Sequence, residues 1–203
     1  MYWLSGHDLC VVRGDRCLFE HLQFELNPGE MLMISGPNGS GKTSLLRAIA
    51  GLIEPDEGEI RWQGARAGRQ RQAFHANVVW MGHRSGFKGD LSVVENLRFE
   101  SSLRAASGSA LEDVFNRLGL AGIRDLPFRL LSAGQQRRVA LARMLLSGAA
   151  LWIMDEPLTH LDAAGRELVS ELVQAHLADD GLCAMATHQD VPIDAVVRRV
   201  AFE

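Results

Sequence analysis

The chain has 203 residues, of which 47 % are hydrophobic, and its 25 acidic and 21 basic residues give a net charge of −4. This length suffices for one sizeable core, and the mildly acidic balance argues against a general nucleic-acid binder. No apolar run approaches 18 residues, and no basic segment followed by an apolar one begins the chain. We therefore expect neither a bilayer-spanning helix nor a secretory signal.

Residues 1–35 alternate short strand-like runs with turns. Residues 13–16 and residues 27–30 each contain a glycine beside polar residues, and each predicts a hairpin turn. The three cysteines, Cys10, Cys17 and Cys183, form no CxxC pair. We expect them to be core or strand thiols in a reducing compartment.

A short apolar run, residues 31–35, leads into a glycine-rich loop, which a helix expected over residues 44–52 follows. The loop fits the pattern G-x-x-x-x-G-K-[ST] of a phosphate-binding loop, and strand, loop, helix is the setting this motif requires. Glycines let backbone N–H groups approach phosphate oxygens, and the helix directs its positive end at the anion. The residues expected to bind a nucleotide here are Gly36, Pro37, Asn38, Gly39, Ser40, Gly41, Lys42, Thr43 and Ser44.

Two side chains of the loop have distinct roles. Lys42 reaches the β- and γ-phosphates, and the hydroxyl of Thr43 ligates Mg²⁺. Among the 21 Lys and Arg residues only Lys42 and Lys88 are lysine, and one of the two stands in the glycine-rich loop. The compact ammonium group of lysine fits such a loop better than the planar guanidinium of arginine. The alternative interpretation is a glycine-rich turn that binds nothing.

The next segment contains two short strand candidates, residues 59–62 and residues 78–80. Four arginines, Arg61, Arg66, Arg69 and Arg71, lie close together in the sequence. We interpret them as a solvated hairpin and loop, with binding of an acidic partner or of lipid head groups as the alternative.

From residue 92 to about residue 120 the pattern is helical. Ser92 and Glu95 fit a capping box, and an apolar stripe follows at helical spacing. We predict that residues 85–148 form an inserted helical subdomain, and that residues 1–84 and 149–203 form the nucleotide-binding core of one domain. The members of the stripe are Leu111, Val114, Phe115 and Leu118.

Residues 131–135 resemble a helix N-terminus. Ser132 is a possible cap of this helix. The hydroxyl of Ser132, the N–H group of Gly134 and the positive end of the helix make a second phosphate-binding surface, next to Gln135. One chain thus has a single nucleotide loop but two phosphate-binding surfaces. This mismatch predicts a symmetric homodimer in which each chain completes the site of the other.

The fully apolar strand at residues 151–154 runs into Asp155 and Glu156. A carboxylate at the carboxyl end of a buried parallel strand faces the ligand crevice, so Asp155 can hold Mg²⁺ and Glu156 can polarise an attacking water. A helix over residues 163–178 and a strand over residues 182–187 follow. Strands alternating with helices predict an α/β fold whose mostly parallel sheet is covered on both faces.

The order of these motifs, followed by Asp162 and then by His188, resembles the ATP-binding subunit of an ABC transporter over nearly the whole chain. The resemblance implies a P-loop NTPase core with N-terminal antiparallel strands and an inserted α-helical subdomain. It also implies that residues 36–43 are the Walker A loop, Asp155 the Walker B acid and Glu156 the general base. Residues 131–135 are then the signature that meets the γ-phosphate of ATP held by the opposite chain.

The same resemblance gives roles to further residues. It places Asp162 in the loop that links the two sites, and His188 against the γ-phosphate. Two positions depart from the family pattern. His83 stands where glutamine is usual, and we expect it to act through water or to sense the membrane partner, since Mg²⁺ prefers oxygen ligands. Arg13 stands where an aromatic residue usually stacks on adenine; a guanidinium can stack there, and an exposed turn arginine is the alternative.

Within the family, the chain most resembles the haem exporter ATPases of cytochrome c maturation, through residues 80–83, 131–143 and 151–157 and its early end after His188. That resemblance implies two integral-membrane partner subunits and a peripheral location on the cytoplasmic face of a bacterial inner membrane. It also links hydrolysis to release of a haem-loaded chaperone. The residues themselves contain no CxxCH motif.

Two other classes compete with a transporter ATPase. A soluble ABC ATPase acting on DNA or ribosomes has long coiled-coil insertions or two such domains in one chain, and this chain has neither. A non-hydrolysing nucleotide-binding regulator is disfavoured by Glu156 and His188.

Overall fold

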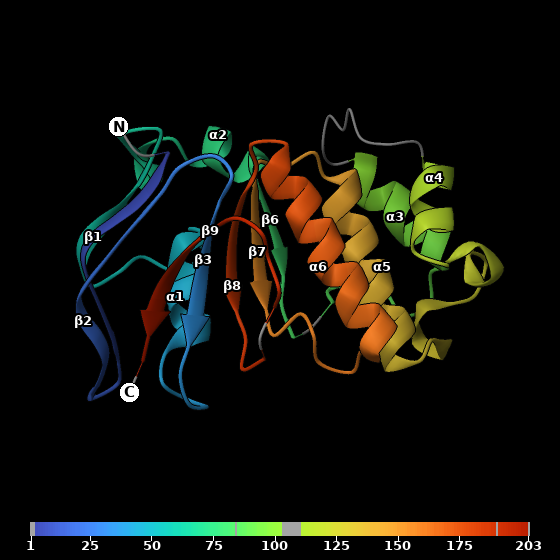
Figure 1. Ribbon diagram of the computed structural model, residues 1–203, viewed down its shortest axis with the longest axis horizontal. Coiled ribbons are helices and arrows are strands. Elements are labelled where there is room, and N and C mark those ends of the chain that lie inside the picture. Colours follow the sequence, from blue (N-terminus) through green and yellow to red (C-terminus); the bar gives the residue numbers. More distant parts are fainter. Residues whose placement is uncertain (1–2, 84, 103–110, 190, 203) are drawn as a thin grey trace.

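The computed structural model describes residues 3–83, 85–102, 111–189 and 191–202, which form two β-sheets with flanking helices (Figure 1). The antiparallel sheet has the order β2-β1-β4-β5, and in the other sheet, with the order β6-β7-β8-β3-β9, every described pair is parallel. The predicted α/β fold with N-terminal antiparallel strands is therefore confirmed. The strands are β1 (Leu4–Arg13), β2 (Arg16–Leu26), β3 (Glu30–Ser35), β4 (Glu57–Trp62), β5 (Ala65–Arg66), β6 (Val78–Met81), β7 (Leu151–Asp155), β8 (Leu182–Ala186) and β9 (Val196–Ala201).

Helices cover both faces of the parallel sheet. Helix α1 lies between the two sheets and contacts β1, β7 and β8, while α5 and α6 cover the opposite face and α3 and α4 pack outside α5 (Figure 1). Across the described ranges, none of the helices is both long and apolar enough to cross a bilayer. The α-helices are α1 (Lys42–Ile49), α2 (Arg71–Ala76), α3 (Val93–Ser102), α4 (Leu111–Arg117), α5 (Ala133–Leu146) and α6 (Ala163–Ala178), and the 3₁₀ helices are Ala67–Arg69, Ala121–Ile123 and Phe128–Leu130.

The strands of the parallel sheet are apolar on both sides because both sides are buried. On β7, Trp152 and Met154 join the hydrophobic cluster that contains α5 and α6, whereas Leu151 and Ile153 join the cluster that contains α1. Strands β3 and β8 alternate in the same way. Successive side chains of a strand point to opposite faces, so a sheet covered twice needs a continuous apolar run.

The caps and the apolar stripe of the helical region agree with the sequence. The Glu95 N–H donates to the hydroxyl of Ser92, and the Ser92 N–H donates back to the Glu95 carboxylate at 2.8 Å. The Ser92 hydroxyl also donates to this carboxylate at 2.7 Å, and the bonds from the hydroxyl and from the Ser92 N–H hold the pKa of Glu95 below its ordinary value. Val114, Phe115 and Leu118 are buried, which confirms the stripe. Residues 103–110, which the helical pattern included, lie outside the described residues.

Two expectations need correction, and two elements escaped prediction. The helix after the glycine-rich loop begins at Lys42, two residues before its predicted start, because Lys42 and Thr43 already have helical backbone. The turn at residues 27–30 is no hairpin, since it leads from β2 into β3 of the other sheet. Strand β9 and helix α2 were not predicted: β9 carries exposed arginines at the sheet edge, and α2 has only six residues, so neither has a clear apolar period.

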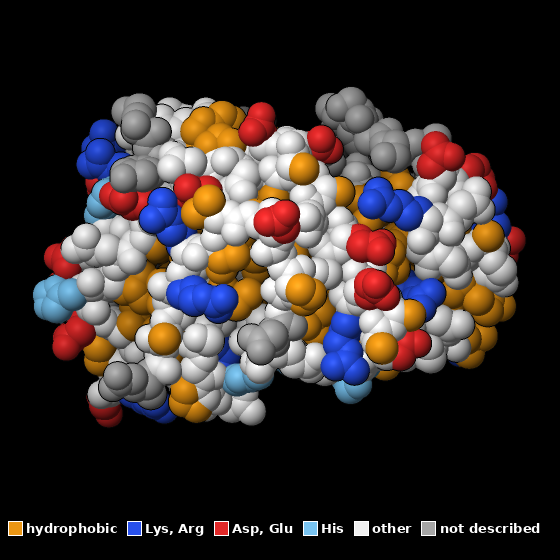
Figure 2. Space-filling view, in the orientation of Figure 1, with side chains coloured by type: hydrophobic (Ala, Val, Ile, Leu, Met, Phe, Trp, Pro, Cys, Tyr) orange, Lys and Arg blue, Asp and Glu red, His pale blue; other side chains and the backbone are white. Residues whose placement is uncertain are grey.

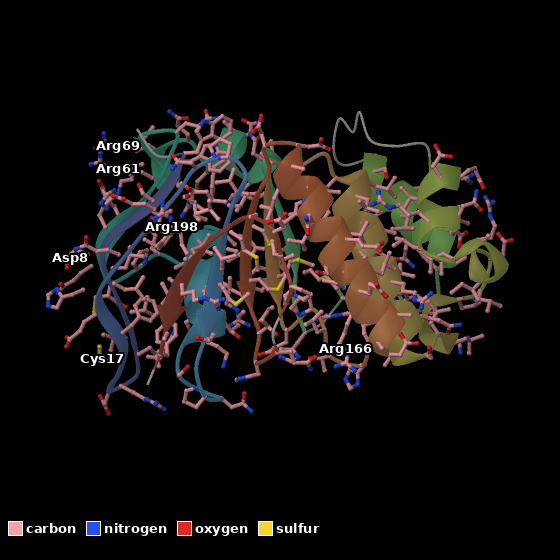
Figure 3. All side chains as sticks on the ribbon, in the orientation of Figure 1. Asp8, Cys17, Arg61, Arg69, Arg166 and Arg198 are labelled. Carbon is pink, nitrogen blue, oxygen red and sulfur yellow. The ribbon has the colours of Figure 1, made fainter. Side chains whose placement is uncertain are left out.

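The arginine cluster is solvated, as the sequence indicated. Arg61 and Arg66 both pair with Glu59, and Arg71 lies 3.6 Å from Glu54. The side chains of Arg61 and Arg69 lie at the same end of the molecule (Figure 3). On the face drawn in Figure 2, basic and acidic side chains are interspersed, with no continuous basic surface. This mixed charge gives no support to a nucleic-acid interface on that face.

The three cysteines lie on strands, with Cys10 on β1, Cys17 on β2 and Cys183 on β8, and all three are free thiols. Burial raises the pKa of the Cys183 thiol to about 12, so this side chain is uncharged at neutral pH. The expectation of strand thiols is confirmed.

We expect His176 to make the stability of the fold depend on pH. Its ring stacks on Trp152 at 4.1 Å, its Nε2 lies 3.2 Å from the carbonyls of Ala150 and Leu182, and burial lowers its pKa. Protonation then favours the unfolded chain, so the contribution of His176 is complete above the ordinary histidine pKa of about 6.5 and is lost as the pH falls below it. Urea unfolding at pH 7.5 and 5.5 should show a smaller acid-induced loss for His176→Phe; an equal loss in both proteins would contradict this.

Candidate nucleotide-binding site

A cavity of about 280 Å³ opens where the glycine-rich loop meets the carboxyl end of β7. This is the edge of a parallel sheet at which α/β proteins bind ligands. The sequence predicted all but one of the lining residues, which are Leu18, Asn38, Gly39, Gly41, Lys42, Thr43, Ser44, His83, Asp155 and Glu156.

The loop backbone requires glycine at two positions, one near each end of the loop. Gly41 has φ 115° and precedes the first residue of α1, and a Cβ there would lie 3.3 Å from the Cβ of Leu18. Gly36 has φ 139°, and its Cβ would come within 2.7 Å of Phe202. Both angles are ones that L side chains rarely adopt. The N-terminus of α1 therefore opens directly into the cavity, where its unpaired N–H groups suit an anion.

Lys42, Thr43 and Asp155 line the cavity, and the last two form a pair of oxygen groups. The side chain of Lys42 is buried, and its Nζ donates to the carbonyls of Gly36 at 2.7 Å and Pro37 at 2.9 Å. The hydroxyl of Thr43 donates to Asp155 Oδ2 at 2.9 Å. Mg²⁺ binds such oxygens and takes its remaining ligands from water and phosphate, so the residues present fit this ion.

Glu156 and His188 meet beside this oxygen pair. Glu156 Oε1 and Asn38 Oδ1 each lie 3.1 Å from His188 Nε2. Since Nε2 carries at most one hydrogen, His188 donates to one of the two acceptors at a time. Glu156 Oε1 is buried, and His188 is the one partner recorded for it among the described residues.

Glu156 also has an unusual backbone. Its φ of 49° lies in the left-handed region, which costs a residue other than glycine about 1–2 kcal/mol. Such conformations persist where neighbouring structure fixes them, and they concentrate at functional sites. The side chain direction of Glu156 is thus set by the turn that ends β7.

Nine predicted site residues are not among those that line this cavity. Four of them belong to the loop or contact the lining, namely Gly36, Pro37, Ser40 and His188, and the other five lie elsewhere. Arg13 is exposed at the end of β1, and its guanidinium donates to the carbonyl of the preceding residue. Asp162 caps α6 by accepting from the Gly165 N–H at 2.8 Å. The remaining three, Ser132, Gly134 and Gln135, lie at the N-terminus of α5, where Ser132 and Gln135 cap one another. One chain therefore presents the loop and the carboxylates together, and the signature elsewhere.

His83 lines both this cavity and a neighbouring one of about 210 Å³, whose wall includes Ala133 and Arg137 of α5. Two contributors to the region escaped sequence analysis. Leu18 is an apolar residue on an outer strand, which no motif marks. Arg137 lies in an arginine pair, and only the charge inside an apolar helical pattern could have drawn attention to it.

The fold and this cavity define a P-loop nucleotide-binding protein of the α/β class. Residues 19–159 match the family model described as ABC transporter. The chain belongs to the ABC transporter family, within which it is an ATPase subunit, and the family predicted from the motifs is confirmed.

Relatives and solved structures agree with this assignment. The cytochrome c biogenesis ATP-binding export protein CcmA of Vibrio vulnificus (strain YJ016) is 46 % identical over 195 residues, or 95 % of each chain. The CcmA of Methylococcus capsulatus is 46 % identical over 94 % of this chain and 93 % of its own. The resemblance to cytochrome c maturation ATPases is thus confirmed.

Solved structures share the fold at lower identity. A putative ABC transporter ATP-binding protein from Pyrococcus furiosus superposes with a TM-score of 0.83 at 23 % identity, covering 97 % of this chain and 96 % of that one. MJ0796, a bacterial ABC transporter cassette solved as a dimer, gives 0.81 at 20 % identity, covering 92 % and 88 %. At these identities the likeness concerns the fold alone.

Proposed function

We propose that this chain is the ATP-hydrolysing subunit of a bacterial membrane exporter that serves cytochrome c biogenesis. One observation carries the enzymatic part: Glu156, whose carboxylate lies 3.1 Å from His188, lines the same cavity as the Thr43–Asp155 oxygen pair at the open end of α1. An anion site, a cation site and a base in one cavity are the parts that phosphoryl transfer to water requires.

The proposed roles follow from position in the cavity. The loop N–H groups, the ammonium of Lys42 and the end of α1 bind the phosphates of ATP. Thr43 and Asp155 hold Mg²⁺, which, when bound, neutralises charge on the phosphate oxygens. Glu156 accepts a proton from the attacking water, and His188 donates to the γ-phosphate, for which its Nε2 exchanges the contact with Asn38 or Glu156.

We further propose that ATP joins two copies of the chain. The signature residues Ser132, Gly134 and Gln135 do not line the chain's own cavity, and we propose that they contact a nucleotide held by a second copy. Asp162, at the start of α6, then links the two sites. Arg13 at the turn is the proposed adenine contact, and the division into a core and an inserted subdomain at residues 85–148 belongs to the same proposal.

The proposal about membrane partners is based on the names of the similar proteins and not on the geometry of the cavity. Proteins 46 % identical to this chain are named as cytochrome c biogenesis export proteins. We propose that the chain binds two integral-membrane subunits at the cytoplasmic face of the inner membrane, with His83 sensing them, and that hydrolysis serves release of a haem-loaded chaperone.

The proposal predicts the phenotype of a bacterium from which the encoding gene is deleted. Haem-stained gels of membrane and periplasmic fractions should lose the c-type cytochromes, because export coupled to their biogenesis stops. Wild-type protein and the control variant Glu167→Gln, which changes an exposed carboxylate on α6, should restore them, and Glu156→Gln should not. Normal cytochromes in the deletion strain would rule out this role.

A further inference from the structure

Arg137, the fifth residue of α5, donates hydrogen bonds to backbone carbonyls on both sides of Glu156. Its Nε donates to the Pro157 carbonyl at 3.0 Å, and its Nη2 donates to the carbonyls of Asp155, at 3.1 Å, and of Glu156. Its Nη1 reaches a different segment and donates to the Gly82 carbonyl at 3.1 Å. One side chain thus joins α5 to the turn that ends β7 and to the segment that follows β6.

The chemistry of these contacts requires arginine. A guanidinium presents five N–H donors in a rigid plane, and here it serves four carbonyl oxygens at once. The ammonium of lysine is a point charge that does not match a planar fork. Burial lowers the pKa of Arg137, while the charges of Asp155 and Glu156 oppose that shift, so the cation is retained.

The turn held by Arg137 needs support. Glu156 has left-handed backbone, and its two flanking peptide groups supply carbonyls to the guanidinium. The held carbonyls of Asp155 and Glu156 fix the orientation of those peptides, and so the direction in which the Glu156 carboxylate leaves the chain. The restraint originates in α5, a helix that does not itself line the cavity.

A second arginine of α5 strengthens the connection to the segment around His83. Arg143 donates to the carbonyls of Trp80 and Ser85, each at 2.8 Å, while Arg137 holds Gly82 between them. The helix therefore holds this segment at several points. Its N-terminus is the Ser132–Gln135 capping box, one turn before Arg137. A displacement of this N-terminus moves the donors that hold Glu156.

We propose that Arg137 is a positioning residue through which the signature end of α5 sets the catalytic geometry of Glu156. The inference rests on the proposed function. In the homodimer, ATP held by one copy engages Ser132 of the second copy, and Arg137 of that second copy then fixes its own Glu156. The nucleotide at one site thereby readies the base at the other, which makes hydrolysis cooperative in ATP.

The test compares Arg137→Gln with Arg138→Gln, a matched control next to it on α5. Among the described residues, the guanidinium of Arg138 donates to the carbonyl of Leu118 at 3.4 Å, and neither residue lines the cavity. For Arg137→Gln we expect kcat to fall at least tenfold, the Hill coefficient for ATP to fall to 1, and the Kd of ATP for the monomer to stay within twofold. Arg138→Gln should match the wild type in all three.

A merely structural role would give a different result. If kcat, ATP affinity and the melting temperature all fall together in Arg137→Gln and Arg137→Lys restores all three, the positioning role is overturned. Should Arg137→Gln not fold, Arg137→Lys takes its place: a folded protein that binds ATP normally, with low kcat and a Hill coefficient of 1, supports the proposal. Wild-type kcat or retained cooperativity in either variant contradicts it.

A double variant asks whether Arg137 acts through Glu156. If it does, adding Arg137→Gln to Glu156→Gln should reduce the residual rate by less than twofold, whereas a full tenfold further loss would mean that the two residues act independently. These outcomes are separate from failure of the proposed function. A wild-type protein without ATP turnover, or a fully active Glu156→Gln protein, would contradict that function before Arg137 is considered.

Discussion

Glu156→Gln is expected to lower the rate of ATP hydrolysis at least a hundredfold while the Kd for ATP changes less than threefold. General-base catalysis contributes about 10²–10⁴ to rate, and an amide of the same shape cannot accept the proton. In the proposed function the phosphate contacts come from the loop and α1, so we expect binding to persist. Phosphate release from the purified protein with Mg²⁺ and ATP, beside a fluorescent-nucleotide titration, measures both quantities.

Size-exclusion chromatography extends the same experiment. With hydrolysis blocked, ATP that bridges two chains is not consumed, so Glu156→Gln with ATP and Mg²⁺ should elute as a dimer and return to a monomer without nucleotide. The control is Glu167→Gln, which replaces an exposed carboxylate on α6 and should keep wild-type turnover. A Glu156→Gln protein that stays monomeric with bound ATP would count against the bridging scheme, and one with normal turnover against the base.

Lys42→Ala should lose ATP affinity by a hundredfold or more. A hydrogen bond to a charged group contributes about 1.5–3 kcal/mol, and Lys42 is expected to make two to the β- and γ-phosphates. A loss of about 3 kcal/mol corresponds to roughly a hundredfold change in Kd. The ammonium is already buried against the loop carbonyls, so it needs to move little to reach a phosphate. Isothermal titration with ATP and Mg²⁺ gives the affinities directly.

The other lysine of the chain provides the matched control. Lys88 lies outside the cavity, with its Nζ 4.7 Å from the ring centroid of Phe99. Lys88→Ala removes the same charge from the chain and should leave the Kd within twofold of the wild type. Equal losses in both variants would indicate a general effect of charge, and unchanged affinity in Lys42→Ala would remove the loop from the nucleotide site.

Local sequence determined much of this site. The glycine spacing of residues 36–43 predicted the loop because only glycine tolerates the backbone of Gly36 and Gly41, and the apolar run ending at Asp155 predicted a buried strand with a carboxylate at its end. The capping box at Ser92 was readable because its partner Glu95 lies three residues away, whereas at Ser132 the sequence indicated a cap and the structure added its partner Gln135. Each of these features depends on short-range contacts.

Long-range contacts were decided only by the tertiary structure. The 3.1 Å approach of His188 to Asn38 joins residues 150 positions apart, and no local pattern encodes it. Strand β9 forms because β3 offers it an edge, although its own exposed arginines hide the strand from a periodicity argument. The turn at residues 27–30 was assigned to a hairpin because composition reveals a turn but not the sheet into which the next strand enters.

Arg137 illustrates the difference between what local sequence predicts and what only the tertiary structure decides. The sequence established by itself that α5 begins at a capped signature and that a carboxylate pair ends β7. Only the fold brought the guanidinium, 18 to 20 positions earlier in the chain, against the carbonyls of that turn. Backbone carbonyls carry no sequence signal, since every residue has one. Which of them a buried arginine binds is therefore fixed by packing alone.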